Sequence, residues 1–579
     1  MAKLKTEVDI ENKLQVSEIH RPSAFEGALW AVLGIKDAQT IFHSPSGCYI
    51  NQHQNGLMND LFEMYTSHLS YGDLLHGAGG TLEKTLQKLI TKGSPAIFIV
   101  TSPTVEITKD DVEGIVEKLD YEKCVVIRPP IGGTVHQGKE EGFLSLISFM
   151  DEKVEKKEKS VNLIGPTYNM FNWKADLEEL RRMLFSIGIS VNAVITADST
   201  MRQIISAPQA MLNICIYPFD CGVTFAQKMQ ERFGVPYIAN TIPIGFSESA
   251  RWIEEVAAFF NLAVSDYLKS EIEKGFRLIR SGSVFTVTFE TPVALSLENH
   301  NTYAVGISHF FKKELGIEIC FAAVGDEEVG KKVEEVSGSV LVSPTIDEKR
   351  TQYEETSPLL IMGNFYDLKI SKDLGFLNFL FADIPTISFL ATENGPYMGF
   401  RGASYLIQQV VNQVYINLFI ETKGEMGGEI SLGEARWNPK AEDALRKIAE
   451  MIPHFIRTKS VKKLQKKAEE LAHKEKSEVT LEIFKTVAKE YTPTRFKTKF
   501  LEVFEEDAAD FTHHEESKED QPKLTFSMEW DEAAREMLNM VPAEFKTKAV
   551  LGTEKYAKKH NHPRITSQVV EKYRKELGF

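Results

Sequence analysis

Short apolar runs alternate with helical patterns over roughly the first 420 residues of the chain. Each run ends near a turn that contains proline, glycine or serine, and amphipathic stretches such as residues 82–90 and 176–185 predict helices between the runs. Continuous apolar runs between helices are typical of parallel strands that helices cover on both faces. We therefore predict strands at residues 41–43, 96–100, 125–127, 161–164, 191–195 and 212–216.

The same alternation continues beyond Ser283 and predicts a third block of this kind. Its strands are expected at Val284–Phe289, Glu318–Ala323, Val340–Ser343, Leu359–Met362 and Thr386–Leu390. The stretch from Tyr405 to Ile420 contains several Gln and Asn residues, so it predicts an amphipathic helix rather than a membrane span. The fold class that follows is α/β, with three doubly wound Rossmann-like domains at residues 1–158, 159–282 and 283–433.

The chain changes character after residue 433, where helix-forming residues, Lys and Glu dominate. We predict an all-helical tail of two related small modules, at residues 434–495 and 528–579, joined by an acidic linker at residues 496–527. The Lys- and Arg-rich faces of the modules are compatible with a solvated surface and with a partner contact. The matching positions are Trp437 and Trp530, Pro453 and Pro542, Ala468 and Ala557, and the pairs Val479-Thr480 and Ile565-Thr566.

Composition and charge narrow the class of partner and the compartment. The 579 residues carry a formal net charge of -15, which argues against nucleic acid as the main partner. A basic protein surface would suit this charge, and solubility alone explains it equally well. The five cysteines form no CxxC pair, the N-terminus lacks the apolar core of a signal peptide, and no run of about 18 apolar residues occurs. We therefore expect a cytoplasmic protein without a membrane span.

The thiol of Cys48 is the strongest candidate for chemistry. It follows the predicted strand that ends at His43, beyond the turn Ser44-Pro45-Ser46-Gly47. Ligands of open α/β sheets bind at the carboxyl ends of strands, which makes this position informative. One thiolate is too little for a metal site, which usually needs about four ligands. Cys48 is therefore either a small buried hydrophobe or one ligand of a site that another chain completes.

The remaining candidates give weaker signals. His43 and His53 bracket Cys48 and could position a redox centre or pass a proton, although structural roles are more common. The Gly-Ala-Gly-Gly-Thr segment at residues 77–81 could cradle a phosphate but lacks the full dinucleotide-binding spacing. No GxxxxGKS/T motif occurs, so any ATP would bind to another subunit. The core or the solvated surface is expected for Cys124, Cys215, Cys221, Cys320, His513, His514, His560 and His562.

Several segments, taken in order over about residues 25–490, resemble the nitrogenase-like reductases, most closely the Z subunits of chlorophyllide a reductase. The strongest match is residues 161–172, VNLIGPTYNMFN, followed by residues 176–182, DLEELRR. Both tail modules resemble the small C-terminal domain of this family and of dark protochlorophyllide reductase. Further matches lie at residues 191–192, 213–217, 243–245 and 396–403.

The resemblance implies a catalytic subunit that reduces the C7=C8 double bond of a chlorin. It implies that Cys48 is one ligand of a 4Fe-4S cluster and that a Y-type partner supplies three cysteines, in a heterotetramer of two Y and two Z chains. Electrons would come from a separate ATP-hydrolysing iron–sulfur reductase, the X subunit. The chlorin would occupy an apolar cavity, with Tyr397 and Met398 as candidates for substrate contact and His43 and His53 for proton transfer.

The sequence departs from the family pattern in one respect and leaves alternatives open. Two tail modules stand where one is expected. Pro103 occupies the end of the next predicted strand, so no second cluster ligand is expected there. In dark protochlorophyllide reductase the B subunit carries an aspartate at the position of Cys48, and the cysteine favours the Z subunit. The alternatives are this B-type subunit and, from another class, a non-catalytic scaffold that builds or carries a metal cofactor.

Overall fold

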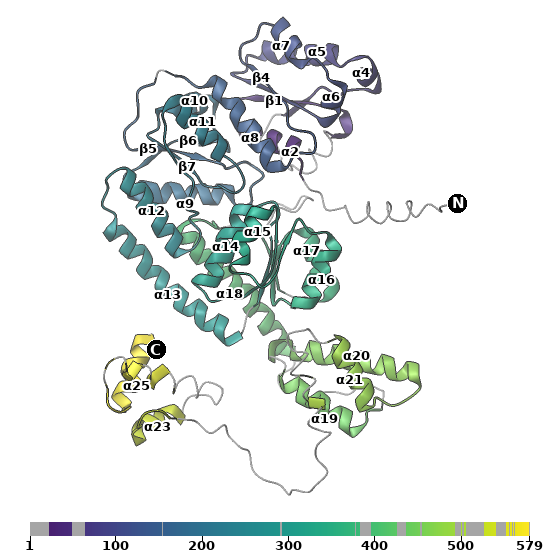
Figure 1. The fold of residues 1–579 in the computed structure, drawn as a ribbon, viewed down its shortest axis with the longest axis vertical. Coiled ribbons are helices and arrows are strands. Elements are labelled where there is room, and N and C mark those ends of the chain that lie inside the picture. Colours follow the sequence, from purple (N-terminus) through teal and green to yellow (C-terminus); the bar gives the residue numbers. More distant parts are fainter. Residues whose placement is uncertain are drawn as a thin grey trace. The chain divides into compact units, whose positions relative to one another are not determined.

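The structure is a computed structural model of the 579-residue chain (Figure 1). Two compact units are present, Met1–Glu506 and Asp507–Phe579, and each is described by itself. The described residues are 22–48, 64–152, 154–289, 292–376, 378–382, 395–424, 436–451, 454–491, 500, 503–504, 526–539, 550, 552–554, 556–558, 560 and 562–577.

The first domain is built on a four-stranded parallel sheet with strand order β2-β1-β3-β4. Neighbouring residues of β1 face opposite sides: Ile41 packs with α5, while Phe42 stacks on Phe25 of α2 with ring centroids 4.3 Å apart. The elements are α2 (Ala24–Leu33), β1 (Gln39–His43), β2 (Met64–Thr66), α4 (Tyr71–His76), α5 (Gly79–Lys92), β3 (Ile97–Thr101), α6 (Pro103–Thr108), α7 (Val112–Lys118), β4 (Cys124–Ile127), α8 (Val135–Ser145) and the 3-10 helix η2 (Leu146–Phe149).

The second domain carries a four-stranded parallel sheet with strand order β6-β5-β7-β8. One face, which includes Leu163 and Ile214, packs with α9 and α12, and the other face packs with α11. The elements are β5 (Ser160–Ile164), α9 (Trp173–Ser186), β6 (Ser190–Ile195), α10 (Met201–Ile205), η3 (Ala207–Gln209), β7 (Leu212–Cys215), α11 (Val223–Phe233), β8 (Tyr237–Ile238), α12 (Phe246–Phe259) and α13 (Ser265–Phe289).

The third domain carries a five-stranded parallel sheet with strand order β11-β10-β9-β12-β13. Helices α14 and α15 cover one face and α16 and α17 the other (Figure 1). The elements are β9 (Val293–Ser296), α14 (Asn301–Lys313), β10 (Ile319–Val324), α15 (Glu327–Glu334), β11 (Val340–Val342), α16 (Ile346–Thr356), β12 (Leu360–Gly363), α17 (Phe365–Leu374), β13 (Asn378–Phe381) and α18 (Gly399–Gly424).

The predicted α/β fold class with parallel sheets is confirmed, but one predicted strand is wrong. Residues Val284–Phe289 form the last turns of α13, and the strand of this region is β9. The β-branched side chains favour a strand locally, but α13 packs against α18, and packing overrides a weak propensity. The strand predicted at Thr386–Leu390 lies outside the described residues. The domain limits given above stay predictions.

Helices α2 and α8 approach each other so closely that their contact requires glycine. A Cβ atom on Gly27 would lie 2.0 Å from the carbonyl oxygen of Val135, and a Cβ atom on Gly138 would lie 1.7 Å from that of Ala24. Each helix begins with a capping box, which fixes where it starts. Because α2 also packs on β1, this contact sets the position of the strand that leads to Cys48.

A fully buried carboxylate, that of Asp176 in the first turn of α9, joins segments of the second and third domains. One oxygen accepts the backbone N–H groups of Tyr397 and Met398, at 2.6 and 2.9 Å. The other accepts the hydroxyl groups of Tyr217 and Tyr303, at 3.1 and 2.5 Å. Four donors offset part of the cost of burying the charge. Burial nevertheless raises the pKa of Asp176 to about 6.

The two tail modules share a common core arrangement. Trp437 and Val479 form a parallel bridge in the first module, and Trp530 and Ile565 form the same bridge in the second. The threonine after the bridge, Thr480 or Thr566, caps the last helix of its module. Its hydroxyl accepts the backbone N–H three residues later, that of Ile483 or Val569. The helices are α19 (Pro439–Met451), α20 (His454–Glu475) and α21 (Leu481–Tyr491) in the first, and α23 (Glu532–Asn539) and α25 (Ser567–Leu577) in the second.

One predicted match between the modules is wrong. The indole N–H of the bridging tryptophan donates to Glu469 in the first module and to Glu554 in the second, at 3.1 and 3.0 Å. A buried alanine, Ala472 or Ala557, lies three residues after each glutamate. Its carbonyl oxygen accepts a backbone N–H from just beyond the helix, that of Ser477 or His562. Ala557 therefore matches Ala472 and not Ala468. The bridging tryptophan and this glutamate are 32 residues apart in the first module and 24 in the second, so counting from the prolines misaligns the alanines.

We expect Gly138→Ala to destabilise the first domain by about 1–3 kcal/mol, because the added Cβ overpacks the contact between α2 and α8. The control is Gly80→Ala in α5, where a Cβ would meet nothing within 4 Å. Urea unfolding of both variants checks this. Equal midpoints for the two variants would show that the helices can move apart at little cost.

We expect the stability of the wild type, relative to an Asp176→Asn variant, to fall as the pH rises from about 4 to about 6. Below the raised folded-state pKa of about 6 the folded chain holds a proton that the unfolded chain, with its ordinary pKa of 3.8, releases earlier. The full difference corresponds to on the order of 3 kcal/mol. Urea unfolding of both proteins from acidic to neutral pH measures it, and a difference that is independent of pH would contradict it.

Candidate functional site

Cys48 lies beyond the carboxyl end of β1, in a helical turn that begins at Ser46. Its backbone N–H donates to the carbonyl oxygen of Pro45 at 3.1 Å, and its side chain is half-buried against the core that the first and second domains share. Burial raises the pKa of the thiol, and the carboxylate of Glu26 adds to this. The free thiol is therefore protonated at neutral pH, whereas coordination to a metal ion would deprotonate it.

His43 is the last residue of β1, and its side chain is fully buried. Nδ1 lies 2.8 Å from the hydroxyl oxygen of Ser67. Nε2 is buried and has no hydrogen-bond partner among the residues that the structure describes. Burial lowers the pKa of His43 to about 4, against the opposing effect of Asp110. The imidazole is therefore neutral at neutral pH, and its Nε2 can hydrogen-bond to a bound group.

Polar groups from β1, β2 and β3 meet at this edge of the sheet. The backbone N–H of Ser44 donates to the Ser67 hydroxyl at 3.2 Å, and that of Ser102 donates to the carbonyl oxygen of His43 at 3.0 Å. The Ser102 side chain caps α6, whose first residue is the exposed Pro103. The chain therefore enters helix α6 directly after β3, whereas after β1 it forms the turn that carries Cys48.

The other predicted residues lie apart from this edge or outside the described residues. His53, His513 and His514 lie outside them. Cys215, Cys221 and Cys320 are buried, and Cys124 is half-buried in β4, where burial raises the pKa of its thiol to about 12. His560 and His562 stand beside the Tyr556 ring, with ring centroids 4.4 and 6.4 Å from it. In the segment at residues 77–81, Ala78 is the N-cap of α5.

Tyr397 and Met398, the predicted substrate contacts, have buried side chains with relative exposures of 1% and 0%. Their backbone N–H groups bind Asp176, and the Tyr397 hydroxyl donates to the carbonyl oxygen of Phe381 at 3.1 Å. These contacts give both residues a structural role at the start of α18. Contact with a substrate stays a prediction.

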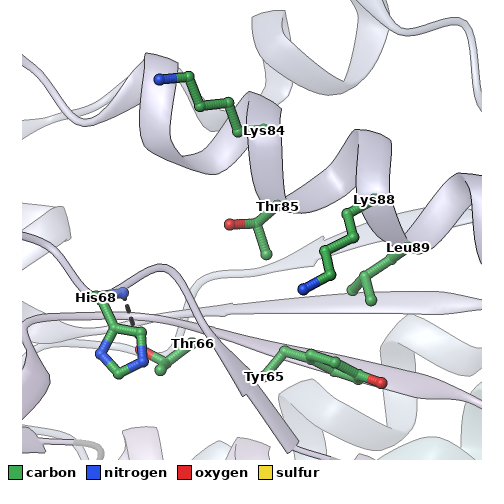
Figure 2. A pocket seen from close by; sticks show the side chains of 7 residues that line it. All are labelled: Tyr65, Thr66, His68, Lys84, Thr85, Lys88 and Leu89. Carbon is green, nitrogen blue, oxygen red and sulfur yellow. Dashed lines mark hydrogen bonds between the residues drawn. The ribbon is translucent and has the colours of Figure 1, made fainter.

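A groove that the sequence analysis did not find lies between β2 and α5 (Figure 2). Its volume is about 400 Å³. Lysines four residues apart on an amphipathic helix are the sequence signal that could have indicated it. The lining residues are Tyr65, Thr66, His68, Lys84, Thr85, Lys88 and Leu89.

The residues around Cys48 fit a metal group that receives a single ligand from this chain. In the described part of the chain, no three His, Cys, Asp or Glu side chains stand close enough to hold a metal ion together. Cys48 itself is only half-buried, at a strand end where ligands of this fold class bind. One sulfur donor at a half-exposed strand end is compatible with a metal group to which the described part of this chain gives a single ligand.

Similar proteins and a similar solved structure relate the chain to known proteins. The B subunit of light-independent protochlorophyllide reductase from Heliobacterium modesticaldum is 23% identical over 515 residues, which cover 80% of this chain and 96% of that protein. The corresponding subunit from Bradyrhizobium sp. (strain ORS 278) is 26% identical over 423 residues, or 68% and 79% of the two chains. The solved structure "Nitrogenase Cp1 at pH 6.5" superposes with a TM-score of 0.60 at 16% identity, over 70% of this chain and 94% of that one, and shows the fold alone.

Among the described helices, none is both long and apolar enough to span a bilayer. The family described as nitrogenase component 1 type oxidoreductase matches residues 23–415, from the start of α2 into α18. This match covers all three parallel sheets and the turn that carries Cys48. The chain belongs to the nitrogenase component 1 type oxidoreductase family.

Proposed function

We propose that the chain is the catalytic Z-type subunit of a cytoplasmic, nitrogenase-like chlorophyllide a reductase. It would bind a Y-type partner in a heterotetramer of two Y and two Z chains and share a 4Fe-4S cluster with it. A separate X-type reductase, which alone binds ATP, would supply the electrons. The reaction is the two-electron, two-proton reduction of the C7=C8 double bond of the chlorin.

The observation that carries this proposal is the position of Cys48. The thiol stands half-exposed at the end of β1, and the α2–α8 contact and the Phe25–Phe42 stack hold that strand in place. A lone thiol held this rigidly fits one corner of a cluster that a second chain completes. The family membership supports the redox class, and the B-subunit relatives support a tetrapyrrole substrate.

When bound, a 4Fe-4S cluster supplies one-electron transfer at a potential that its ligands and solvent access set. The chain's own residues position it. The turn at Pro45 fixes the Cys48 backbone, and the Glu26 carboxylate, held by the backbone N–H of Ser23 at 2.7 Å, places a negative charge near the thiol. His43 is neutral at neutral pH, so it can form hydrogen bonds to a bound group, but its pKa of about 4 makes it a weak proton acceptor there.

A second candidate is a B-type subunit of light-independent protochlorophyllide reductase. The relatives named above carry that name and extend over most of this chain. Cys48 favours the first candidate, because the resemblance described above implies an aspartate at this position in B subunits. The two candidates share the cluster and differ in the substrate.

We expect Cys48→Ala, co-expressed anaerobically with a Y-type partner, to lower the iron content of the complex about tenfold or more, because one cluster ligand is lost. Cys124→Ser, at the other half-buried thiol, is the matched control and should retain its iron. Iron and sulfide analysis with electron paramagnetic resonance measures this. An unchanged cluster signal in Cys48→Ala would refute the ligand assignment.

We expect the wild-type complex, supplied with the reductase and ATP, to reduce chlorophyllide a in preference to protochlorophyllide. Absorption spectra of the pigment products distinguish the two reductions. A preference for protochlorophyllide would establish the second candidate. If an iron-loaded complex turns over neither pigment, a cofactor-assembly scaffold becomes the better explanation.

A further inference from the structure

The groove between β2 and α5 combines positive charge with hydroxyl groups and an apolar floor. Figure 2 shows Thr85 and Lys88 extending from α5 toward β2, which carries Tyr65 and Thr66, while Lys84 extends along the rim. Leu89 and the Tyr65 ring supply the apolar part. A volume of about 400 Å³ falls within the range of small-molecule sites.

The charge of this groove is not neutralised within the chain. Lys84 and Lys88 are exposed and form no ion pair among the described residues, although the protein as a whole carries a net charge of -15. Glu83, the acidic residue on the same helix, instead pairs with Lys118 at 2.9 Å. Like charges four residues apart on a helix repel each other, and a bound anion would relieve that repulsion.

The donors of the groove suit a phosphate group. Two ammonium groups offer up to three N–H donors each, and Thr66 adds a hydroxyl that already accepts the His68 backbone N–H at 3.1 Å. A carboxylate has two oxygens to receive these donors, whereas a terminal phosphate has three. We propose that the groove between β2 and α5 binds the phosphate group of a small molecule, with Lys84 and Lys88 as the charged contacts.

The groove is connected to the turn that carries Cys48. The Nδ1 atom of His68 lies 3.3 Å from the hydroxyl oxygen of Ser46, two residues before Cys48. A backbone bridge between Pro45 and Leu69 joins the same two segments. His68 itself has a φ of 50°, a left-handed conformation that costs free energy in a non-glycine residue. Phosphate binding beside His68 should therefore change the accessibility of the Cys48 thiol. This inference does not depend on the proposed reductase function.

The test uses the full chain without metal and inorganic pyrophosphate as the probe, titrated by calorimetry at low ionic strength. The variant Lys84→Gln/Lys88→Gln should bind pyrophosphate about tenfold more weakly, since it loses two charge-assisted contacts. The control Lys123→Gln/Lys269→Gln removes the same charge from exposed lysines elsewhere and should bind as the wild type does. Alkylation of Cys48 should change rate with pyrophosphate in the wild type and in the control only.

Three outcomes would overturn the proposal. Equal affinity in the two double variants would mean that pyrophosphate binds to the general charge of the protein. Binding of an acidic peptide at the groove without any binding of pyrophosphate would assign the lysines to carboxylates of a protein partner. Absence of any pyrophosphate binding to the wild type would reject the site. Because none of these measurements involves iron, partner chain or pigment, failure of the reductase proposal would not affect them.

Discussion

The contact between α2 and α8 is the constraint on which the candidate site depends. Added side chains at Gly27 and Gly138 would meet backbone oxygens at 2.0 and 1.7 Å, so the two helices pack backbone against backbone. Close packing of this kind leaves little freedom for either helix. It places Phe25 on Phe42, and thereby positions β1 and the turn beyond it. Under the proposed function, in which the thiol meets ligands from another chain, such a support would help to position it.

A second interaction, around Asp176, serves the connection between domains rather than the site. The carboxylate receives two backbone N–H groups from the start of α18 and two tyrosine hydroxyls, and burial still raises its pKa to about 6. Burying this charge costs free energy at neutral pH. The four donors come from distant parts of the sequence and all bind the Asp176 carboxylate. This shared acceptor fixes the arrangement of these segments relative to one another. The buried positions of Tyr397 and Met398 follow from this arrangement.

The two tail modules have the same core contacts although their lengths differ. The bridge between tryptophan and a β-branched residue, the indole contact with a glutamate and the alanine at the helix end recur in both modules. In each module these contacts lie within a small hydrophobic core. The spacing from the bridging tryptophan to this glutamate is not retained: it is 32 residues in the first module and 24 in the second.

The sequence by itself determined the class of the fold and the position of its most informative thiol. Continuous apolar runs between amphipathic helices are typical of parallel strands that helices cover, and Cys48 was expected to follow a strand because the apolar run ends at His43. Local patterns failed at Val284–Phe289, where packing of α13 on α18 prevailed over β-propensity. They failed also at Ala468, because the two modules do not keep the same spacing between their matching residues. Only the tertiary structure decided that Asp176 accepts hydrogen bonds from three segments and that His43 is buried and neutral. It also decided that Lys84 and Lys88 line a groove between α5 and β2. Each of these depends on residues far apart in the sequence meeting in space, and no periodicity or spacing along the chain encodes such meetings.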